Sequence, residues 1–326
     1  MQNEQNLDSD SLRDQIEKEA QMLVGNEPLQ AKQPEAAKIT SLGTAEKFKV
    51  YDVDDPIASE LGWKNVPIEY LPSQGLFYET ATQVAIRAAT VAEIRHWSTI
   101  DENDLLGVDD MLNFIIEKCC KIKIPGRAAS FKDLKEIDRF YLIFAIRDYT
   151  FKNGENKLYV NVTDNDGVGD RIEVNKDVID YFNPDERMMK YFSHETHHFN
   201  FEMKNGEKFV MYFPSLGVMA FIKNYIKTKQ QQGQNFDKAF IKYAPFLFND
   251  WRTLTQSTYD KAVQDSYGWS VVRISALDKL VEILSSSVNP QVRFTTQNGA
   301  EEVAPLNFQG GIKSLFLISD IFGELV

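Results

Sequence analysis

The stretch HFNFEMKNGEKFVMYFPSLGVMAFIKNYIKTKQ (residues 198–230) changes its periodicity half-way and indicates the fold class. Up to Pro214, apolar and polar residues alternate, as they do in half-buried β-strands. Asn205-Gly206 stands between the two alternating runs and predicts a tight hairpin. After Pro214 the apolar residues take helical spacing, so we expect a helix to follow the hairpin. Strands and helices in separate runs are typical of an α+β protein.

Toward the N-terminus, the sequence predicts a strand–turn–strand unit followed by three helices. The unit is VPIEYLPSQGLFYETATQVAIRAAT (66–90). Thr90 and Glu93 have the spacing of a capping box and start the first helix. Asp109 is expected to open the second helix, and Ser130 with Asp133 to cap a third that covers residues 131–149.

Toward the C-terminus, the sequence predicts a β-rich insert and then a helical region. Alternation in KLYVNVTD (157–164) and RIEVN (171–175) extends the β-rich region that contains the hairpin. Helices are expected over 215–230, 235–250, 251–266 and about 275–284, with QQQGQ (230–234) as a linker. Asn298-Gly299 predicts a final hairpin.

These patterns predict four segments. Residues 1–47 form an N-terminal arm, 48–149 the strand–turn–strand unit with helices, 150–214 the β-hairpin insert, and 215–326 a helical domain that ends in a hairpin and a short apolar tail. The arm contains one expected helix, SLRDQIEKEAQMLVG (11–25), with Leu12, Ile16 and Leu23 on one side. This stripe is too narrow to fold alone, which leaves two interpretations: an arm that folds on a partner, or a solvated tail.

Composition excludes several classes of protein. The 326 residues carry a formal net charge of −12, and an acidic surface repels phosphate backbones, so we expect no nucleic-acid partner. The two cysteines, Cys119 and Cys120, are adjacent and supply no disulfide framework, which fits a reducing compartment. No apolar run is long enough to span a bilayer, and the polar N-terminus has no signal-peptide pattern. We expect a protein that is soluble inside the cell.

His194, Glu195 and His198 spell H-E-x-x-H, the zinc-protease helix motif, and His197 lies between them. The chemistry requires both histidines on one face of a helix. Here the helix DERMMKYF (185–192) is expected to end near Ser193. In the strand that follows, His194 and His198 would be about 13 Å apart. We predict no catalytic zinc site, and a zinc-dependent hydrolase is the alternative of a different class.

Three further patterns have both a functional and a structural interpretation, and we prefer the structural one for each. An EF-hand-like loop from Val162, which stands where aspartate should be, also matches a tight hairpin turn. An acidic cluster could bind Mg²⁺, but it also suits a solvated loop before a helix. Cys119 is expected to be a buried structural thiol. The residues of the loop and of the cluster are Asp164, Asp166, Gly167, Asp170 and Glu173, and Asp101, Glu102, Asp104, Asp109 and Asp110.

The sequence contains no Gly-rich phosphate loop, no serine nucleophile elbow and no paired C-x-x-C motif, so we predict neither an enzyme nor a cofactor. It does contain an aromatic-rich helix, FIKYAPFLFNDW (240–251), with more aromatic residues than one face readily buries. This helix is our candidate for an interface anchor. The alternative is a helix buried between two domains. The aromatic residues are Phe240, Tyr243, Phe246, Phe248 and Trp251.

Several ordered motifs resemble the T4-type contractile-phage baseplate protein family. LPSQGLFYETATQVAIRAATVAEIRHWSTIDENDLLGVDDMLNFIIEKCCKI (71–122) looks like the opening of that family, with its Leu-Pro-Ser-x-Gly-x-x-Tyr turn at Leu71–Tyr78 and its Thr-Val-x-Glu helix start at Thr90–Glu93. SFKDLKEIDRFYLIFAIRDYTF (130–151) is similar to the family's Asp-Arg-x-Tyr/Phe-Leu helix, here Asp138–Leu142. The hairpin FEMKNGEKFVMYFPSLG (201–217) also fits. The resemblance covers residues 65–215 well and the C-terminal half loosely.

The resemblance implies a non-enzymatic component of a tail baseplate hub, or a chaperone that assembles the hub and then leaves. Its partners would be other baseplate, hub and tail proteins of the phage, in a hetero-oligomer. Its location would be the host cytoplasm during assembly and then the virion tail baseplate.

One departure from the family is informative. Relatives carry Cys-x-x-Cys zinc knuckles where this chain reads FKNGENKLYVNV (151–162) and RFTTQNGAEEVAPLNF (293–308). Asn153-Gly154 and Asn298-Gly299 keep the turn residues without the cysteines. We therefore expect cysteine-free, zinc-ribbon-like hairpins that hold no metal.

Overall fold

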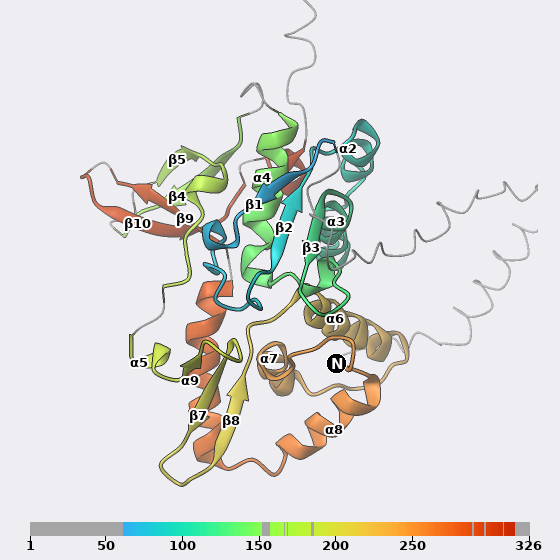
Figure 1. The fold of residues 1–326 in the computed structure, drawn as a ribbon, viewed down its shortest axis with the longest axis vertical. Coiled ribbons are helices and arrows are strands. Elements are labelled where there is room, and N and C mark those ends of the chain that lie inside the picture. The colour runs from blue at the N-terminus through green and yellow to red at the C-terminus, as the bar shows by residue number, and fades with distance from the viewer. Residues whose placement is uncertain are drawn as a thin grey trace, which may run out of the picture. The chain divides into compact units, whose positions relative to one another are not determined.

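The computed structural model describes residues 61–151, 157–165, 167, 169–183, 186–288, 290–296, 298–308 and 310–316. Within these ranges the chain forms eight α-helices and ten short strands, which pair in four antiparallel sheets (Figure 1). The prediction of an α+β fold is therefore confirmed. The predictions for the arm with Leu12, Ile16 and Leu23, for the Asn153-Gly154 turn and for the tail beyond Phe316 lie outside the described residues.

The first sheet has the strand order β1–β2–β3 and packs on two helices, α3 and α4. The predicted capping box is confirmed, because Thr90 N donates to Glu93 Oε2 at 2.7 Å at the start of α2. The prediction that Asp109 opens the next helix is wrong. That helix begins four residues earlier, where the Asp104 carboxylate accepts from Leu106 N. The elements are β1 (Lys64–Val66), β2 (Gln83–Ile86), α2 (Val91–Trp97), α3 (Leu105–Cys119), β3 (Cys120–Lys123) and α4 (Arg139–Thr150).

The predicted helix over residues 131–149 starts only at Arg139. Backbone groups that a helix would use internally bond instead to the segment before α6. Leu216 N donates to Leu134 O at 2.8 Å, and Glu136 N donates to Pro214 O at 2.9 Å. A partner about 80 residues away therefore overrides the local helical pattern. The residues between form two 3-10 turns, η2 (Phe131–Asp133) and η3 (Glu136–Asp138).

Two hairpins that are distant in the sequence lie side by side. They are β4 (Tyr159–Thr163) with β5 (Gly169–Glu173), and β9 (Gln291–Thr295) with β10 (Glu301–Pro305). A bridge between Val160 and Phe308 joins them. The hairpin predicted at Asn298-Gly299 is confirmed, with Gly299 at φ +80°.

The third hairpin belongs to a separate sheet with the order β6–β7–β8. Gly206 has φ +84°, a conformation that glycine adopts without strain, so the predicted Asn205-Gly206 turn is confirmed. The strands of the region predicted as one insert thus lie in two different sheets. The elements are α5 (Glu186–Met189), β6 (Phe192–Ser193), β7 (His198–Glu202) and β8 (Lys208–Met211).

Four helices follow β8, and the first, α6, starts where it was expected with Ser215 as its N-cap. The helix expected from residue 251 begins at Gln256, after a capping box formed by Thr255 and Thr258. The helix expected over 275–284 is longer at both ends. The bounds are α6 (Leu216–Gln231), α7 (Lys238–Leu247), α8 (Gln256–Ser266) and α9 (Val271–Val288).

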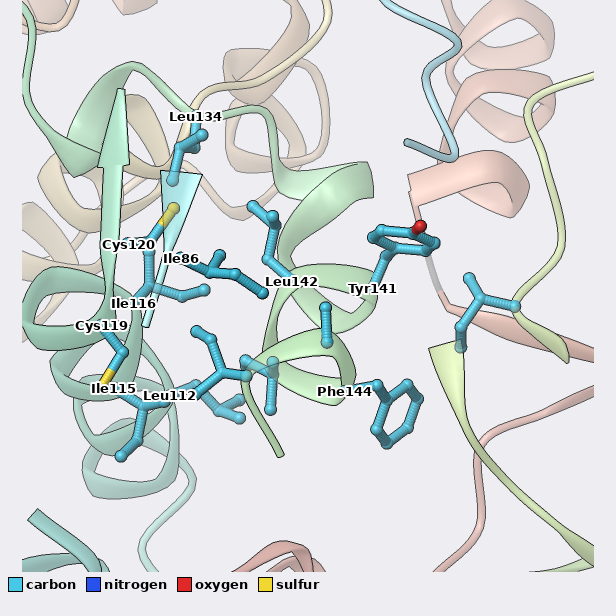
Figure 2. Close-up of a cluster of buried hydrophobic side chains, with 14 of the residues drawn as sticks. Ile86, Leu112, Ile115, Ile116, Cys119, Cys120, Leu134, Tyr141, Leu142 and Phe144 are labelled. Carbon is cyan, nitrogen blue, oxygen red and sulfur yellow. The ribbon is translucent and has the colours of Figure 1, made fainter. Parts of the chain in front are cut away.

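Three hydrophobic clusters hold these elements together. The first joins the β1–β2–β3 sheet, α3, α4 and the paired hairpins. Figure 2 shows part of it, with Ile86 of β2 between Ile116 of α3 and Leu142 of α4. Ile116 and Leu142 are fully buried, and burial of such a side chain contributes roughly 1.5–3 kcal/mol.

The aromatic helix α7 packs between the other two clusters. Phe240 lies in the cluster formed with α6 and α8, whereas Tyr243 and Phe246 lie in the cluster formed with α9 and the β6–β7–β8 sheet. These three side chains are buried, and Phe248 and Trp251 are partly buried against the α6–α8 cluster. The aromatic side chains of α7 therefore pack in the hydrophobic core of this chain.

We predict that Gly217→Ala lowers the free energy of unfolding by about 1–3 kcal/mol, the typical cost of overpacking. A Cβ atom at Gly217 would lie 2.8 Å from Cβ of Trp251 and closer still to its indole ring. The control is Gly169→Ala on β5, where the nearest heavy atom would be Val162 O at 3.9 Å. Chemical denaturation compares the two variants, and equal stabilities would contradict the packing described here.

Candidate functional site

The H-E-x-x-H residues do not lie on a helix. Helix α5 ends at Met189, and residues 194–197 form the turn between β6 and β7. The rings face different neighbours: His194 contacts Phe192, His198 contacts Tyr212, and Nδ1 of His197 lies 3.0 Å from Leu76 O. This geometry lacks the one-face arrangement that zinc hydrolysis requires.

The EF-hand-like loop is a hairpin turn, as expected. Thr163 pairs with Gly169, and Gly167, at φ +81°, donates from its backbone to Asp164 O. Asp166 lies outside the described residues. Within the described part of the chain, no three His, Cys, Asp or Glu side chains gather where they could hold a metal ion.

The interpretation of the acidic cluster as a solvated loop is wrong for Asp109. This residue lies within α3 and pairs with Arg139 of α4, and its Oδ2 atom lies 2.9 Å from Nζ of Lys223 on α6. Glu136 also pairs with Arg139, at 2.5 Å. The ionic group thus joins three helices, and both cations are at least 90% buried. Asp104 caps α3, while Asp101 and Glu102 accept from the backbone N–H groups of Asn103 and Lys313.

Cys119 is buried, as predicted, and so is Cys120. Burial raises the pKa of the Cys119 thiol to about 12, and burial also raises the pKa of Cys120. Both thiols are therefore protonated at neutral pH, and neither supplies the thiolate that cysteine chemistry needs.

The most informative site lies where two of the quoted motifs meet. Asp138, from the Asp138–Leu142 stretch, is completely buried. Its Oδ1 accepts from Ser73 N at 2.8 Å, and its Oδ2 accepts from the Tyr78 hydroxyl at 2.7 Å. The same Tyr78 oxygen accepts from Lys135 N at 2.9 Å. Both ends of the Leu71–Tyr78 turn are therefore fixed to one carboxylate.

Burial shifts the protonation equilibria of this network. It raises the pKa of Asp138 to about 6, although hydrogen bonds from Ser73 and Tyr78 act in the opposite direction. Burial and the Asp138 charge raise the pKa of Tyr78 well above its ordinary value. Asp138 is an anion at neutral pH, but one that carries a desolvation cost.

This cost predicts a pH dependence. The folded pKa of Asp138, about 6, exceeds the unfolded value of 3.8, so its contribution to stability is fully present below pH 4 and lost as the pH rises through 6. Asp138→Asn, which stays neutral, should therefore gain about 2–3 kcal/mol relative to the wild type between pH 4 and pH 7. Paired denaturation curves at both pH values check this, and a constant difference would contradict it.

A pocket of about 400 Å³ lies beside this network. Its walls come from five segments of the chain: the end of the Leu71–Tyr78 turn, the residues around η2, the β6–β7 turn, the residues between β8 and α6, and the loop between α7 and α8. The volume falls in the range of small-ligand and side-chain pockets. The polar residues that matter below are Glu79, Arg127, Asp133, Lys135, His197 and Arg252.

Asp133 forms the ionic centre of one wall. Arg127 donates to its Oδ1 at 2.9 Å, and Arg252 donates to both oxygens at 2.7 and 2.6 Å. Ser130 N and the Trp251 indole add two further hydrogen bonds. The Arg252 side chain and these bonds hold the pKa of Asp133 below its ordinary value, despite burial. The α7–α8 loop is thereby fastened to the η2 segment.

Three non-glycine residues in the described ranges have a strained backbone, and one of them, His197, lines the pocket. The non-glycine residues with positive φ in the described ranges are Gln74, Ala81 and His197, at 52°, 63° and 56°. The first two lie in and directly after the Leu71–Tyr78 turn, and the third is tied to Leu76 by the ring contact given above. Such strain persists where the surroundings over-determine the backbone, and it is frequent at binding sites.

Sequence reasoning missed the residues of this wall. Arg252 and Asp133 are 119 positions apart, and no local spacing predicts that they meet. Lys135 was placed inside a helix that does not form there. The one usable signal was the Leu-Pro-Ser-x-Gly-x-x-Tyr turn, which marks the segment next to the pocket but not its partners.

None of the helices in the described ranges has the length and hydropathy needed to cross a bilayer. Among the described residues, the features that bear most on function are a buried carboxylate network, an ionic group that joins three helices, and the polar pocket beside that network. A comparison with family models, curated proteins and solved structures finds no match to the chain.

Proposed function

We propose that this chain is a non-enzymatic structural component of a contractile phage tail baseplate hub, which acts through protein–protein contacts during tail assembly. The observation that carries the proposal is the contact of Ser73 and Tyr78 with Asp138. These residues belong to two of the stretches that resemble the baseplate family, 60 or more positions apart. Their contact gives a physical reason for those residue types at those places.

The paired hairpins give further support. We propose that residues 157–173 and 291–305 are cysteine-free counterparts of the family's zinc-ribbon-like elements. They follow the third helix and precede the C-terminus, as those elements do, and they meet in space. Asn161 N donates to Asn307 O at 3.0 Å, and Val160 is fully buried beneath them. Backbone hydrogen bonds and a hydrophobic contact thus hold the two hairpins, where metal ligands would stabilise each zinc-ribbon-like element in the relatives.

The proposal includes no catalytic role and no cofactor. The three clustered histidines face separate neighbours, and the cysteines are held as thiols. Among the buried carboxylates, Asp138 and Asp133 accept hydrogen bonds from groups inside the chain, and Glu136 pairs with Arg139. Such groups stabilise a scaffold, and an acidic chain of this kind would meet other tail proteins rather than nucleic acid. We place it in the host cytoplasm during assembly and then in the baseplate.

Electron microscopy of particles made without this chain tests the proposal. We expect that baseplates fail to form, and that wild-type chain supplied from a plasmid restores them. The double variant His194→Ala/His198→Ala should restore them equally well, because these rings hold no catalytic metal in the proposed function. Normal tails in the absence of the chain would contradict the proposal, and failure of the histidine variant alone would favour a zinc-dependent role.

A further inference from the structure

The inner wall of the pocket has unused hydrogen-bond donors. The ammonium of Lys135 donates to Phe213 O at 3.4 Å, and this long bond is its one hydrogen bond within the described ranges. An ammonium has three N–H donors. Arg127 also lines the pocket, and its Nε and one terminal nitrogen are engaged by Glu79 and Asp133, which leaves the other terminal nitrogen without a described hydrogen bond.

The buried carboxylates at this wall are already used. Asp133 receives five hydrogen bonds, and Asp138, which lies behind the wall, receives two. Glu79 and Asp250 do retain acceptor capacity, but their side chains are 47% and 42% exposed. Solvent screens charges at such a rim far more than charges inside the pocket.

We propose that the pocket receives the carboxylate of an aspartate or glutamate side chain from a partner protein, with Lys135 as its main contact and Arg127 as a second donor. A carboxylate supplies an oxygen acceptor that carries a negative charge, whereas the one described hydrogen bond of the Lys135 ammonium goes to a neutral carbonyl oxygen. The lining carries three cations, Arg127, Lys135 and Arg252, and three anions, Glu79, Asp133 and Asp250. Within the described ranges both arginines are paired with these carboxylates, whereas the Lys135 ammonium forms no ion pair. Charge-assisted bonds between an ammonium and a carboxylate are stronger than neutral ones.

His197 contributes to the shape of the site. A carbonyl oxygen only accepts, so the contact with Leu76 O places the proton of the neutral ring on Nδ1. The ring is thereby held in one orientation at the pocket wall. Lys135 is partly exposed as a whole residue, but burial of its ammonium lowers its pKa to about 8. A bound carboxylate would relieve that desolvation cost.

The binding of a carboxylate follows from the pocket alone, whereas its origin in a neighbouring tail protein rests on the proposed function. The test therefore uses the purified full-length chain and two defined probes, acetyl-Gly-Glu-Gly-amide and acetyl-Gly-Gln-Gly-amide. They differ only in carboxylate against amide. Titration calorimetry or NMR at pH 7 and low salt measures both affinities.

We expect the glutamate peptide to bind at least about tenfold more tightly than the glutamine peptide, because hydrogen bonds to charged groups have this effect. Lys135→Met should remove the preference. Lys157→Met, which deletes an exposed lysine paired with Glu173, should leave it unchanged. Binding by the wild type should also weaken as the pH rises from 7 to 9, since Lys135 loses its proton there while carboxylates and guanidinium groups keep their charge.

Equal affinities for the two peptides, or no detectable binding of either, would overturn the proposal. So would a Lys135→Met variant that keeps the preference for glutamate. If Lys135→Met does not fold, the pH series on the wild type decides, and an unchanged affinity at pH 9 counts against Lys135. Each result is independent of whether the chain is found in phage tails, so failure here is distinguishable from failure of the proposed function.

Discussion

Replacement of Asp138 by alanine is expected to lower the free energy of unfolding by roughly 2–4 kcal/mol. The substitution leaves two donors, Ser73 N and the Tyr78 hydroxyl, without their acceptor. Solvent does not replace it, because Asp138 is completely buried. Each buried donor left in this way costs roughly 1–3 kcal/mol. The loss of a desolvated charge offsets part of this cost. Denaturant unfolding at pH 7 measures the change.

Tyr78→Phe completes a double-mutant cycle with Asp138→Ala. It removes the hydroxyl donor to Asp138, together with the acceptor for Lys135 N, but it keeps the ring. Because both substitutions break the same hydrogen bond, the effects of Asp138→Ala and Tyr78→Phe should add to more than the effect of the double variant. A loss of less than about 1 kcal/mol for Asp138→Ala, or strict additivity, would show that the network does not fix the Leu71–Tyr78 turn.

Asp109→Ala is expected to cost a similar amount, roughly 2–4 kcal/mol, through a different mechanism. Asp109 pairs with both Arg139 and Lys223, whose side chains are 9% and 10% exposed. Removal of the shared carboxylate leaves Arg139 with Glu136 alone, and Lys223 with the exposed Asp110 alone, inside the contact between α3, α4 and α6. Removal of one partner of a buried ion pair typically costs about 3–5 kcal/mol of stability. We expect a somewhat smaller loss here because the Asp109 side chain is 26% exposed.

Asp110→Ala is the control for Asp109→Ala. Its carboxylate is next in sequence and also pairs with Lys223, but it is 63% exposed. Surface pairs contribute between about 0 and 1 kcal/mol. Thermal unfolding of both variants, at low and at high salt, should show a large loss of stability for Asp109→Ala alone. Equal losses would place the ionic group at the surface and contradict the joining of the three helices.

Local patterns predicted the local structure well. The Asn205-Gly206 and Asn298-Gly299 turns, the Thr90–Glu93 capping box and helix α6 all follow from residues close together in sequence, whose preferences the tertiary contacts reinforce. The α+β class follows from the same periodicities. What the sequence did not predict is where distant contacts override these preferences. Leu134–Glu136 has helical spacing, but its backbone bonds to Pro214–Leu216.

The candidate site could be predicted only in part, for the same reason. The resemblance singled out Ser73, Tyr78 and Asp138 as members of two motifs, but not their contact, because no local spacing relates them. The H-E-x-x-H pattern made a zinc site worth considering, but the geometry does not support one. These residues lie in a turn, in which His197 has φ +56°, and not on a helix. The pocket wall combines residues from five segments, so its chemistry depends on contacts between residues that are distant in the sequence.

The central claim is that this chain is a structural part of a phage baseplate hub. Quantitative mass spectrometry of purified mature tails, with copies counted against a tail protein of known number, tests it most directly. The account predicts that the chain is present at a small, fixed number of copies per tail. Its presence in infected-cell lysate only, bound to hub proteins, would make it an assembly chaperone. Absence from both the tails and the hub complexes would contradict the claim.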